Sequence, residues 1–273
     1  MANRRSVVIN GDLGGGKSTV SKLLAARLGI RRISVGDLYR AMAAQRGMTA
    51  LQLNLHAELD DKIDHYVDQL QGDIAASGEQ LVVDSRLAWH FFTDALKVHL
   101  ITDPTVAAQR VLGRPAETVE SYASVEEARS RLASRSESER IRFLTQYGAD
   151  KTRLRNYDLV CDSTRATPDQ IVERIVEYLE ARPGEALRPL CHLDPLRIHP
   201  TARVRPSEAL EAQEPIAVGY ASPSFFVIDG HRRLNFAIRA GRTLVAATLV
   251  AEAEEKIAGL SCDRYFAANA TGS

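Results

Sequence analysis

The stretch Gly11-Asp12-Leu13-Gly14-Gly15-Gly16-Lys17-Ser18 decides how the rest of the chain is interpreted. It has the pattern G-x-x-x-x-G-K-[ST], in which glycines let the backbone close around an anion. The apolar run at 6–10 before it predicts a buried strand, and the apolar periodicity at 19–28 after it predicts a helix. A strand, a glycine-rich loop and a helix N-terminus in this order form a phosphate-binding P-loop, because backbone N–H groups and the helix dipole converge on the bound anion.

The motif also assigns roles to the residues of the loop. Lys17 is expected to reach the β- and γ-phosphates of a nucleotide, and Ser18 to place its hydroxyl on Mg²⁺. The alternative, a glycine-rich turn that binds nothing, agrees poorly with a complete motif between a strand and a helix. The residues expected to bind ATP are Gly11, Gly14, Gly15, Gly16, Lys17, Ser18 and Thr19.

Composition limits the class of protein. The chain has 273 residues, of which 45% are hydrophobic, and its 35 basic and 35 acidic residues balance to a formal net charge of zero. That balance gives no overall argument for binding nucleic acid or a membrane surface. Three scattered cysteines do not predict a disulfide framework, and no apolar run reaches the length of a signal peptide or a membrane span. We therefore expect a cytoplasmic protein with no membrane partner.

The chain continues as strands that alternate with helices. This alternation predicts an α/β fold, with a parallel sheet covered by helices on both faces. Gly36 is expected to end the second strand, so that a helix begins at Asp37. Ligands of such sheets bind at the carboxyl ends of the strands. Besides the strand before the P-loop, strands are expected at 32–35, 80–84, 97–101 and 159–162.

Charged residues follow two of these strands. Arg40 and Arg86 could clamp the anionic group of a phosphoryl acceptor, because a guanidinium matches phosphate or carboxylate with two hydrogen bonds. Asp84 could hold Mg²⁺ together with Ser18, or act as a general base if the acceptor is a hydroxyl. Asp37 is a further candidate for the acceptor side. The alternatives are surface salt bridges for the arginines and a turn-capping carboxylate for Asp84.

An arginine-rich helix is expected between the fourth and fifth strands. Ser124 to Glu127 has the form of a capping box, and basic residues recur over 129–142. A charged helix taken alone is usually a solvated face. In a phosphate-transfer fold, however, a helical lid can bring arginines onto the transferring group and exclude water. Arg131 and Arg135 are the residues expected to point inward, and with Lys17 and Asp84 they complete the predicted catalytic set.

Residues 5–180 resemble the cytidylate-kinase-like P-loop kinases, particularly their archaeal branch. The resemblance implies transfer of the γ-phosphoryl group of ATP to a nucleoside monophosphate, with Mg²⁺ and a closing lid. It places Arg40 and Arg86 on the phosphate of the acceptor, while Ser85 stands where that family often has glycine. The matching segments are Gly14 to Val20, Ser34 to Arg40, Val83 to Trp89, Ser138 to Arg140 and Tyr157 to Val160.

A second resemblance lies near the C-terminus. The segment Val227 to Leu234 is similar to the ParB/sulfiredoxin-like domain, in which the corresponding turn opens a helix and holds nucleotide phosphates. The resemblance therefore implies a small α+β domain with a phosphate site. No helix-turn-helix region accompanies it, so sequence-specific DNA binding is not expected. The alternative is an accessory domain that serves packing or formation of a homodimer. The residues of the implied site are Gly230, His231, Arg232 and Arg233.

The sequence thus predicts a kinase domain at 1–182, a linker at 183–190, a ParB/sulfiredoxin-like domain at 191–255 and a C-terminal tail at 256–273. The predicted function is ATP-dependent phosphorylation of a nucleoside monophosphate such as CMP or dCMP. Two alternatives stay open. The acceptor could be a hydroxyl or amine of another metabolite, or the chain could be a nucleotide-binding regulator whose output runs through the ParB-like domain.

Overall fold

A parallel sheet forms the centre of the N-terminal part of the molecule. The computed structural model describes residues 5–48, 62–113, 122–181, 190–202 and 214–269. The first strands lie in the order β2-β3-β1-β4-β5, and neighbours are parallel, which confirms the predicted α/β sheet. Their bounds are β1 (Val7–Gly11), β2 (Arg31–Ser34), β3 (Leu81–Asp84), β4 (Leu96–Ile101) and β5 (Leu159–Asp162).

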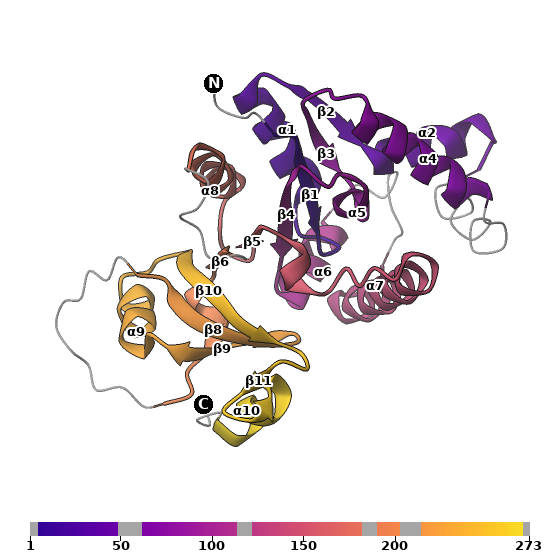
Figure 1. The fold of residues 1–273 in the computed structure, drawn as a ribbon. Coiled ribbons are helices and arrows are strands. Elements are labelled where there is room, and N and C mark those ends of the chain that lie inside the picture. Colours follow the sequence, from indigo (N-terminus) through magenta and orange to yellow (C-terminus); the bar gives the residue numbers. More distant parts are fainter. Residues whose placement is uncertain (1–4, 49–61, 114–121, 182–189, 203–213, 270–273) are drawn as a thin grey trace.

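Helices cover both faces of this sheet (Figure 1). Val7 and Ile9 of β1 are buried with residues of α1 and α8, whereas Val8 packs on the opposite face, since successive side chains of a strand alternate. Both faces therefore contribute to the core. The helices are α1 (Lys17–Leu28), α2 (Val35–Gln45), α4 (Lys62–Ala76), α5 (Ala88–Phe91), α6 (Pro104–Leu112), α7 (Val125–Tyr147) and α8 (Pro168–Glu180), with the 3₁₀ turn η1 (Leu154–Asn156) before β5.

The helix start predicted at Ser124 is confirmed, and capping side chains also open α6 and α8. Asp103 accepts hydrogen bonds from two N–H groups of the first turn of α6, and Pro104 occupies the first helical position. Ser124 accepts from the N–H of Glu127, and Thr167 forms a reciprocal capping box at the start of α8. Each cap and its partner lie within four residues of one another, so a helix start of this kind can be predicted from sequence alone.

The start of α2 differs from the prediction. Gly36 does not end the strand and precede the helix; it lies in the first helical turn, which begins at Val35. The reason is Ser34, whose side chain accepts a hydrogen bond from the N–H of Asp37 and so caps the helix earlier. An N-cap contributes about 0.5–2 kcal/mol, enough to offset the roughly 0.5–1 kcal/mol cost of glycine in a helix.

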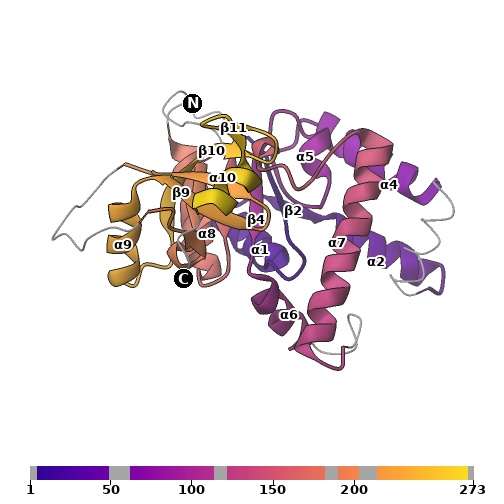
Figure 2. The same ribbon diagram turned by 90° about the horizontal axis from the view of Figure 1, so that it is seen from below.

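The long helix α7 runs from α6 toward α5 and the core of the sheet (Figure 2). Near its start, Ala128 and Leu132 pack against α6. Near its end, Phe143 joins the large hydrophobic core, and the ring of Tyr147 lies 6.2 Å from that of Phe91. This helix occupies the place that the sequence predicted for a lid between the fourth and fifth strands.

The sheet does not end at β5. It continues through β6, which is parallel to β5 and antiparallel to β10, into a ten-stranded sheet in the order β2-β3-β1-β4-β5-β6-β10-β8-β9-β7 (Figure 1). The predicted linker at 183–190 falls outside the described residues except for Leu190, which begins β6. The added elements are β6 (Leu190–Leu193), η2 (Pro195–Arg197), β7 (Ile198–His199), β8 (Ile216–Ala221), β9 (Ser224–Asp229), α9 (His231–Arg239) and β10 (Val245–Glu252).

Buried contacts join the C-terminal strands to the rest of the molecule. One hydrophobic core contains residues from both parts, including Val8 and Phe225. Glu252, only 3% exposed, accepts hydrogen bonds from the N–H groups of Leu154 and Arg155 at 2.8 and 3.1 Å. Arg155 in turn pairs with Glu255 at 2.6 Å. The C-terminal part is therefore packed onto the N-terminal part through one hydrophobic and one polar junction.

The segment 256–273, predicted as a tail, contains regular structure over its described residues. Tyr265 and Phe266 stack on Phe226 with ring centroids 5.7 and 5.2 Å apart, and Cys262 is fully buried. Aromatic and apolar contacts of this kind fix the segment to β9. Its elements are β11 (Lys256–Ile257), β12 (Leu260–Ser261) and α10 (Cys262–Asn269).

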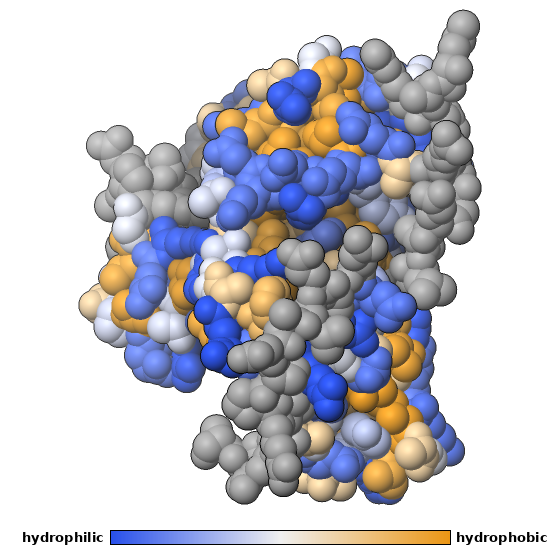
Figure 3. Space-filling model, turned by 90° about the vertical axis from the view of Figure 1, so that its left-hand side faces the viewer, coloured by the Kyte–Doolittle hydropathy of each residue, from blue (hydrophilic) through white to orange (hydrophobic). Residues whose placement is uncertain are grey.

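The surface mixes residue types. On the face seen in Figure 3, hydrophilic residues alternate with smaller hydrophobic areas. Among the described helices, none is long and apolar enough to cross a membrane. Cys161, Cys191 and Cys262 are free thiols buried in the protein, and no disulfide joins the described residues.

Candidate active site

The P-loop follows β1 and leads into α1 as predicted. Gly14 and Gly16 adopt the left-handed conformation, with φ of 81° and 83°. A Cβ at Gly14 would lie 2.8 Å from the carbonyl oxygen of Ala107, so only glycine lets the loop pass this close to α6. Gly16 directly precedes the first turn of α1. The loop therefore brings the N-terminus of α1 to the carboxyl end of the sheet, where an anion is favoured.

Lys17 is folded back over its own loop. Its Nζ donates to the carbonyl oxygens of Gly11 and Asp12 at 2.6 and 3.0 Å. Burial, and after it the positive charge of Arg86, lowers the pKa of Lys17 to about 7. A phosphate group here would oppose both effects, because an anion favours the charged ammonium.

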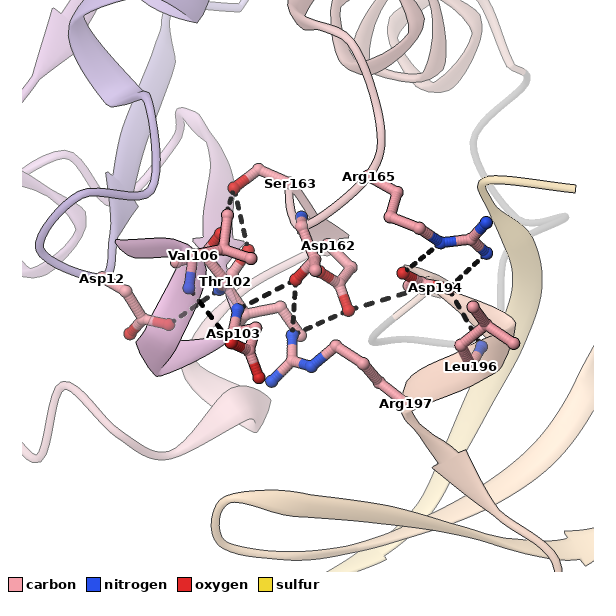
Figure 4. Close-up of polar contacts among 12 residues, drawn as sticks. Asp12, Thr102, Asp103, Val106, Asp162, Ser163, Arg165, Asp194, Leu196 and Arg197 are labelled. Carbon is pink, nitrogen blue, oxygen red and sulfur yellow. Dashed lines mark hydrogen bonds and ion pairs between the residues drawn. The ribbon is translucent and has the colours of Figure 1, made fainter. Parts of the chain in front are cut away.

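Asp12 links the P-loop to a polar network at the ends of β4, β5 and β6 (Figure 4). Its Oδ2 accepts from the N–H of Thr102 at 3.0 Å, and the hydroxyl of Thr102 accepts from Ser163 at 2.9 Å. Asp162, fully buried, accepts from Arg197 of η2 at 2.8 Å. The C-terminal part therefore reaches the same edge of the sheet as the P-loop.

The two residues predicted to hold a metal lie around one guanidinium. Asp84 is 8% exposed at the end of β3, and its Oδ2 accepts from Nη2 of Arg32 at 2.8 Å. The same Nη2 lies 3.2 Å from Oγ of Ser18. The structure thus gathers Ser18 and Asp84 around a positive charge. A hydroxyl and a carboxylate are the oxygen ligands that Mg²⁺ takes in proteins, so these residues fit the ion.

Arg32 was not singled out from the sequence. It lies two residues before the end of β2 and contacts Asp84, which is 52 positions further along the chain. Its neighbour Arg31 forms a salt bridge with Glu79 instead. Because the two arginines are adjacent and point to opposite sides of the strand, sequence pattern alone gives only a weak signal for the role of Arg32.

The predicted acceptor residues Asp37 and Arg40 lie next to each other on α2. They form an ion pair, although the Arg40 side chain is 57% exposed. Asp37 also accepts from Nη1 of Arg32 at 3.1 Å. Burial acts to raise the pKa of Asp37, but hydrogen bonds from Arg40 and Arg32 outweigh it and the pKa is lowered. Arg32 therefore touches both the predicted metal side and the predicted acceptor side.

Arg86 pairs with a carboxylate of the lid helix. Its partner Glu139 is 3% exposed in α7 and also lies 3.0 Å from Nζ of Lys151 and 3.4 Å from Nε of Arg135. Burial is the main cause that lowers the pKa of Arg86 to about 9 and that of Lys151 to about 7. Arg131, predicted to point inward like Arg135, is 61% exposed and pairs with Glu127 at 2.8 Å.

Sequence reasoning did not single out Lys151, and it did not specify the partners of Glu139. Glu139 lies within the segment that resembles archaeal kinases, but its partners come from the loop after β3, from α7 itself and from the loop after α7. Lys151 follows the end of α7 at Tyr147 and its Gly148 cap. Three cations around one buried carboxylate leave a net positive charge, which suits an anionic substrate.

The turn predicted as a second phosphate site lies at the start of α9. Gly230 has a φ of 100°, and a Cβ there would lie 2.9 Å from Nε of Arg233, so the turn requires glycine. Nε2 of His231 lies 3.0 Å from Oγ1 of Thr201, and Arg232 is exposed. Arg233 donates hydrogen bonds to the carbonyl oxygens of Glu214 and Pro215 and to the carboxylate of Asp229, all of which belong to the protein around the turn.

A P-loop at the carboxyl end of a parallel sheet, oxygen ligands gathered around a cation, and an arginine-lined lid define a P-loop kinase. The comparisons with known proteins agree. A family model described as "AAA domain" matches residues 7–143. The chain is 33% identical over 174 residues to the cytidylate kinase of Methanobrevibacter smithii, a match that covers 64% of this chain and 98% of that protein.

A second relative, the cytidylate kinase of Natronomonas pharaonis, is 38% identical over 167 residues, which cover 60% of this chain and 84% of that protein. A shikimate kinase structure from Bacteroides thetaiotaomicron has a TM-score of 0.43 and 16% identity, and covers 65% of this chain and 99% of that one. The chain belongs to the cytidylate-kinase-like P-loop kinases, and it is an ATP-dependent phosphotransferase of the kind that uses Mg²⁺.

Proposed function

We propose that this kinase transfers the γ-phosphoryl group of ATP to a nucleoside monophosphate, with CMP or dCMP as the acceptor. The relatives named cytidylate kinase support the choice of acceptor. The observation that carries the proposal is the position of Arg32, whose guanidinium contacts Ser18 and Asp84 on the predicted metal side and Asp37 on the predicted acceptor side. Residues suited to the donor and residues suited to the acceptor are thus joined through one side chain.

The donor is held by the P-loop. The backbone from Gly11 to Thr19 and the N-terminus of α1 bind the phosphates, and Lys17 exchanges its two carbonyl partners for phosphate oxygens. Ser18 and Asp84 would hold Mg²⁺, which neutralises charge on the β- and γ-phosphates. Lys17 then stays protonated because bound phosphate stabilises the ammonium.

The acceptor is held across the strand ends. Arg86 and Arg40 grip its phosphate, and Asp37 orients Arg40 through their ion pair. An oxygen of the acceptor phosphate attacks the γ-phosphorus, the bond from that phosphorus to the bridging oxygen breaks, and ADP leaves with the electron pair. A phosphate oxygen is already anionic at neutral pH, so no general base is needed and Asp84 is left to the metal.

The lid contributes charge and excludes water. Arg135 and Lys151 share Glu139 with Arg86, so the lid helix α7 brings their charges to the strand end that carries Arg86. The positive charge then lies where negative charge is transferred from donor to acceptor. Arg131, exposed and paired with Glu127, is not required by this arrangement.

We also propose that residues 191–255 form a ParB/sulfiredoxin-like unit, joined to the kinase by the segment 183–190, that holds a nucleotide phosphate at Gly230, His231 and Arg232. The left-handed glycine and the exposed arginine at the start of α9 support it. Arg233 keeps a structural part, since its donors are taken by carbonyls and by Asp229. Nucleotide titration of the full chain against Arg232→Ala tests the site; unchanged affinity in the variant favours an accessory role in packing or dimerisation.

The acceptor is tested with the full chain, ATP and Mg²⁺ against CMP, dCMP, UMP, AMP and GMP, and with no acceptor, while ADP release is followed. We expect the cytidine monophosphates to react fastest and Lys17→Ala to be inactive. If no monophosphate raises ADP release above the acceptor-free rate, the proposed acceptor class is wrong. A panel of hydroxyl and amine metabolites then becomes the next screen.

A further inference from the structure

Arg32 is the side chain at the meeting point of the two halves of the site. Its Nη2 donates to Oδ2 of Asp84 at 2.8 Å and to Oγ of Ser18 at 3.2 Å. Its Nε donates to Oγ of Ser21 at 2.7 Å, and its Nη1 to Oδ2 of Asp37 at 3.1 Å. Each nitrogen of the guanidinium therefore has an oxygen partner, and the partners come from α1, β3 and α2.

These contacts are not those of a surface arginine. The Arg32 side chain is 15% exposed and that of Asp84 is 11% exposed, whereas Arg31 and Glu79 next door are 61% and 43% exposed. An ion pair withdrawn from water is screened less than an exposed one, and moving one partner has a larger electrostatic effect. Arg32 is therefore held in place by the site around it.

The contacts of Nη2 are made with the residues that fit Mg²⁺. A guanidinium and a divalent cation that approach the same hydroxyl and carboxylate oxygens repel each other strongly at such distances. We propose that Arg32 is a built-in counter-ion of the metal site: its Nη2 balances Asp84 while metal is absent and leaves Ser18 and Asp84 when Mg²⁺ enters with the nucleotide. This inference rests on the proposed assignment of Ser18 and Asp84 to the metal.

The other hydrogen bonds of Arg32 hold its guanidinium near the site after Nη2 has left Ser18 and Asp84. Nε still donates to Ser21, and Nη1 still donates to Asp37, which is the partner of Arg40. Entry of the metal then shifts the guanidinium toward Asp37, and competition for that carboxylate loosens Arg40 for the acceptor phosphate. Arg32 is thus a positioning residue that couples the metal side of the site to its acceptor side.

The test is the effect of Mg²⁺ on ADP affinity, measured by calorimetry with the full chain and no acceptor. The ratio of ADP affinities with and without Mg²⁺ should rise about tenfold in Arg32→Gln, because the metal no longer competes with a fixed cation. Arg32→Lys keeps the positive charge but lacks the branched guanidinium, and it should raise the ratio less. Arg31→Gln, on the same strand but paired with Glu79, is the matched control and should leave the ratio unchanged.

A ratio in Arg32→Gln equal to or below that of the wild type overturns the inference, provided that its thermal unfolding midpoint shows a folded protein. If Arg32→Gln does not fold, the same comparison is made with Arg32→Lys. If the ADP affinity of the wild type is the same with and without Mg²⁺, both the assignment of Ser18 and Asp84 to the metal and the inference about Arg32 are wrong. The choice of acceptor plays no part in this measurement, so failure of the acceptor screen leaves its result unchanged.

Discussion

Glu139, buried in the middle of the lid helix α7, forms an ion pair with Arg86, which follows β3. The same carboxylate holds Lys151 at 3.0 Å and Arg135 at 3.4 Å. One negative charge thus ties the lid to the strand end proposed to hold the acceptor phosphate. Because three positive charges surround it, the cluster remains cationic and keeps its attraction for phosphate.

Glu139→Gln is expected to destabilise the fold, because three neighbouring cations lose their shared counter-charge. Removal of one member of a buried ion pair costs about 3–5 kcal/mol of unfolding free energy, which urea denaturation measures. Glu126→Gln, on the same helix but 77% exposed and paired with Arg129, is the matched control and should change little. Equal losses in the two variants would contradict the role of Glu139 as the centre of the cluster.

Arg86→Ala is expected to weaken use of the acceptor. Loss of a charge-assisted pair to the acceptor phosphate should lower kcat/KM for the monophosphate about 50-fold, with a smaller effect on the KM for ATP. Arg131→Ala, exposed and paired with Glu127, should stay within about twofold of the wild type. Steady-state kinetics with each substrate varied in turn measures both. A larger loss in Arg131→Ala than in Arg86→Ala would reverse the assignment of the lid arginines.

The affinity for ATP is expected to fall as the pH rises above 7. Lys17 and Lys151 each have a pKa of about 7 in the free enzyme, mainly because of burial. Bound phosphate favours their charged forms and raises both pKa values, so binding at pH 8 takes up protons. Calorimetry at that pH in two buffers of different ionisation enthalpy measures the uptake, which Lys17→Met should reduce. Binding without proton uptake would contradict the shift.

The same lysines affect the stability of the fold in the opposite direction: the free energy of unfolding rises with pH, whereas the affinity for ATP falls. An unfolded lysine keeps its ordinary pKa of 10.5, so between about 7 and 10.5 the unfolded chain binds more protons than the folded one. The contribution of Lys151 to the free energy of unfolding therefore rises with pH over this window. Lys151→Met should flatten the rise in urea titrations at pH 7, 8 and 9, whereas the exposed Lys256 replaced by Met should leave it unchanged.

What the sequence could predict was local. The P-loop, the parallel sheet and the caps at Asp103 and Thr167 rest on residues a few positions apart, so their signals survive in a single sequence. The partners of Asp84 and Arg86 lie 52 and 53 positions away along the chain, and no local pattern specifies them. β6 was hidden for a similar reason: a strand of four residues beside a Pro- and Gly-rich stretch is set by its pairing with β5 and β10.

Glu252 offers a test of how the C-terminal part is joined to the kinase. It is 3% exposed and accepts from the N–H groups of Leu154 and Arg155, which lie just before β5. Glu252→Ala leaves these two donors without their acceptor, and each such loss costs about 1–3 kcal/mol. We expect the free energy of unfolding, measured with urea, to fall by about 2–6 kcal/mol, and kinase activity to fall with it near the unfolding temperature.

Glu254, two residues further on and exposed, is the matched control for this variant. Glu254→Ala should unfold like the wild type, because it removes a side chain in contact with water. The two parts share one sheet and one core, so Glu252→Ala is expected to lower the stability of both in a single unfolding transition. If the C-terminal part instead unfolds separately while ATP binding persists, the two parts are independent domains and the prediction of a single transition is wrong.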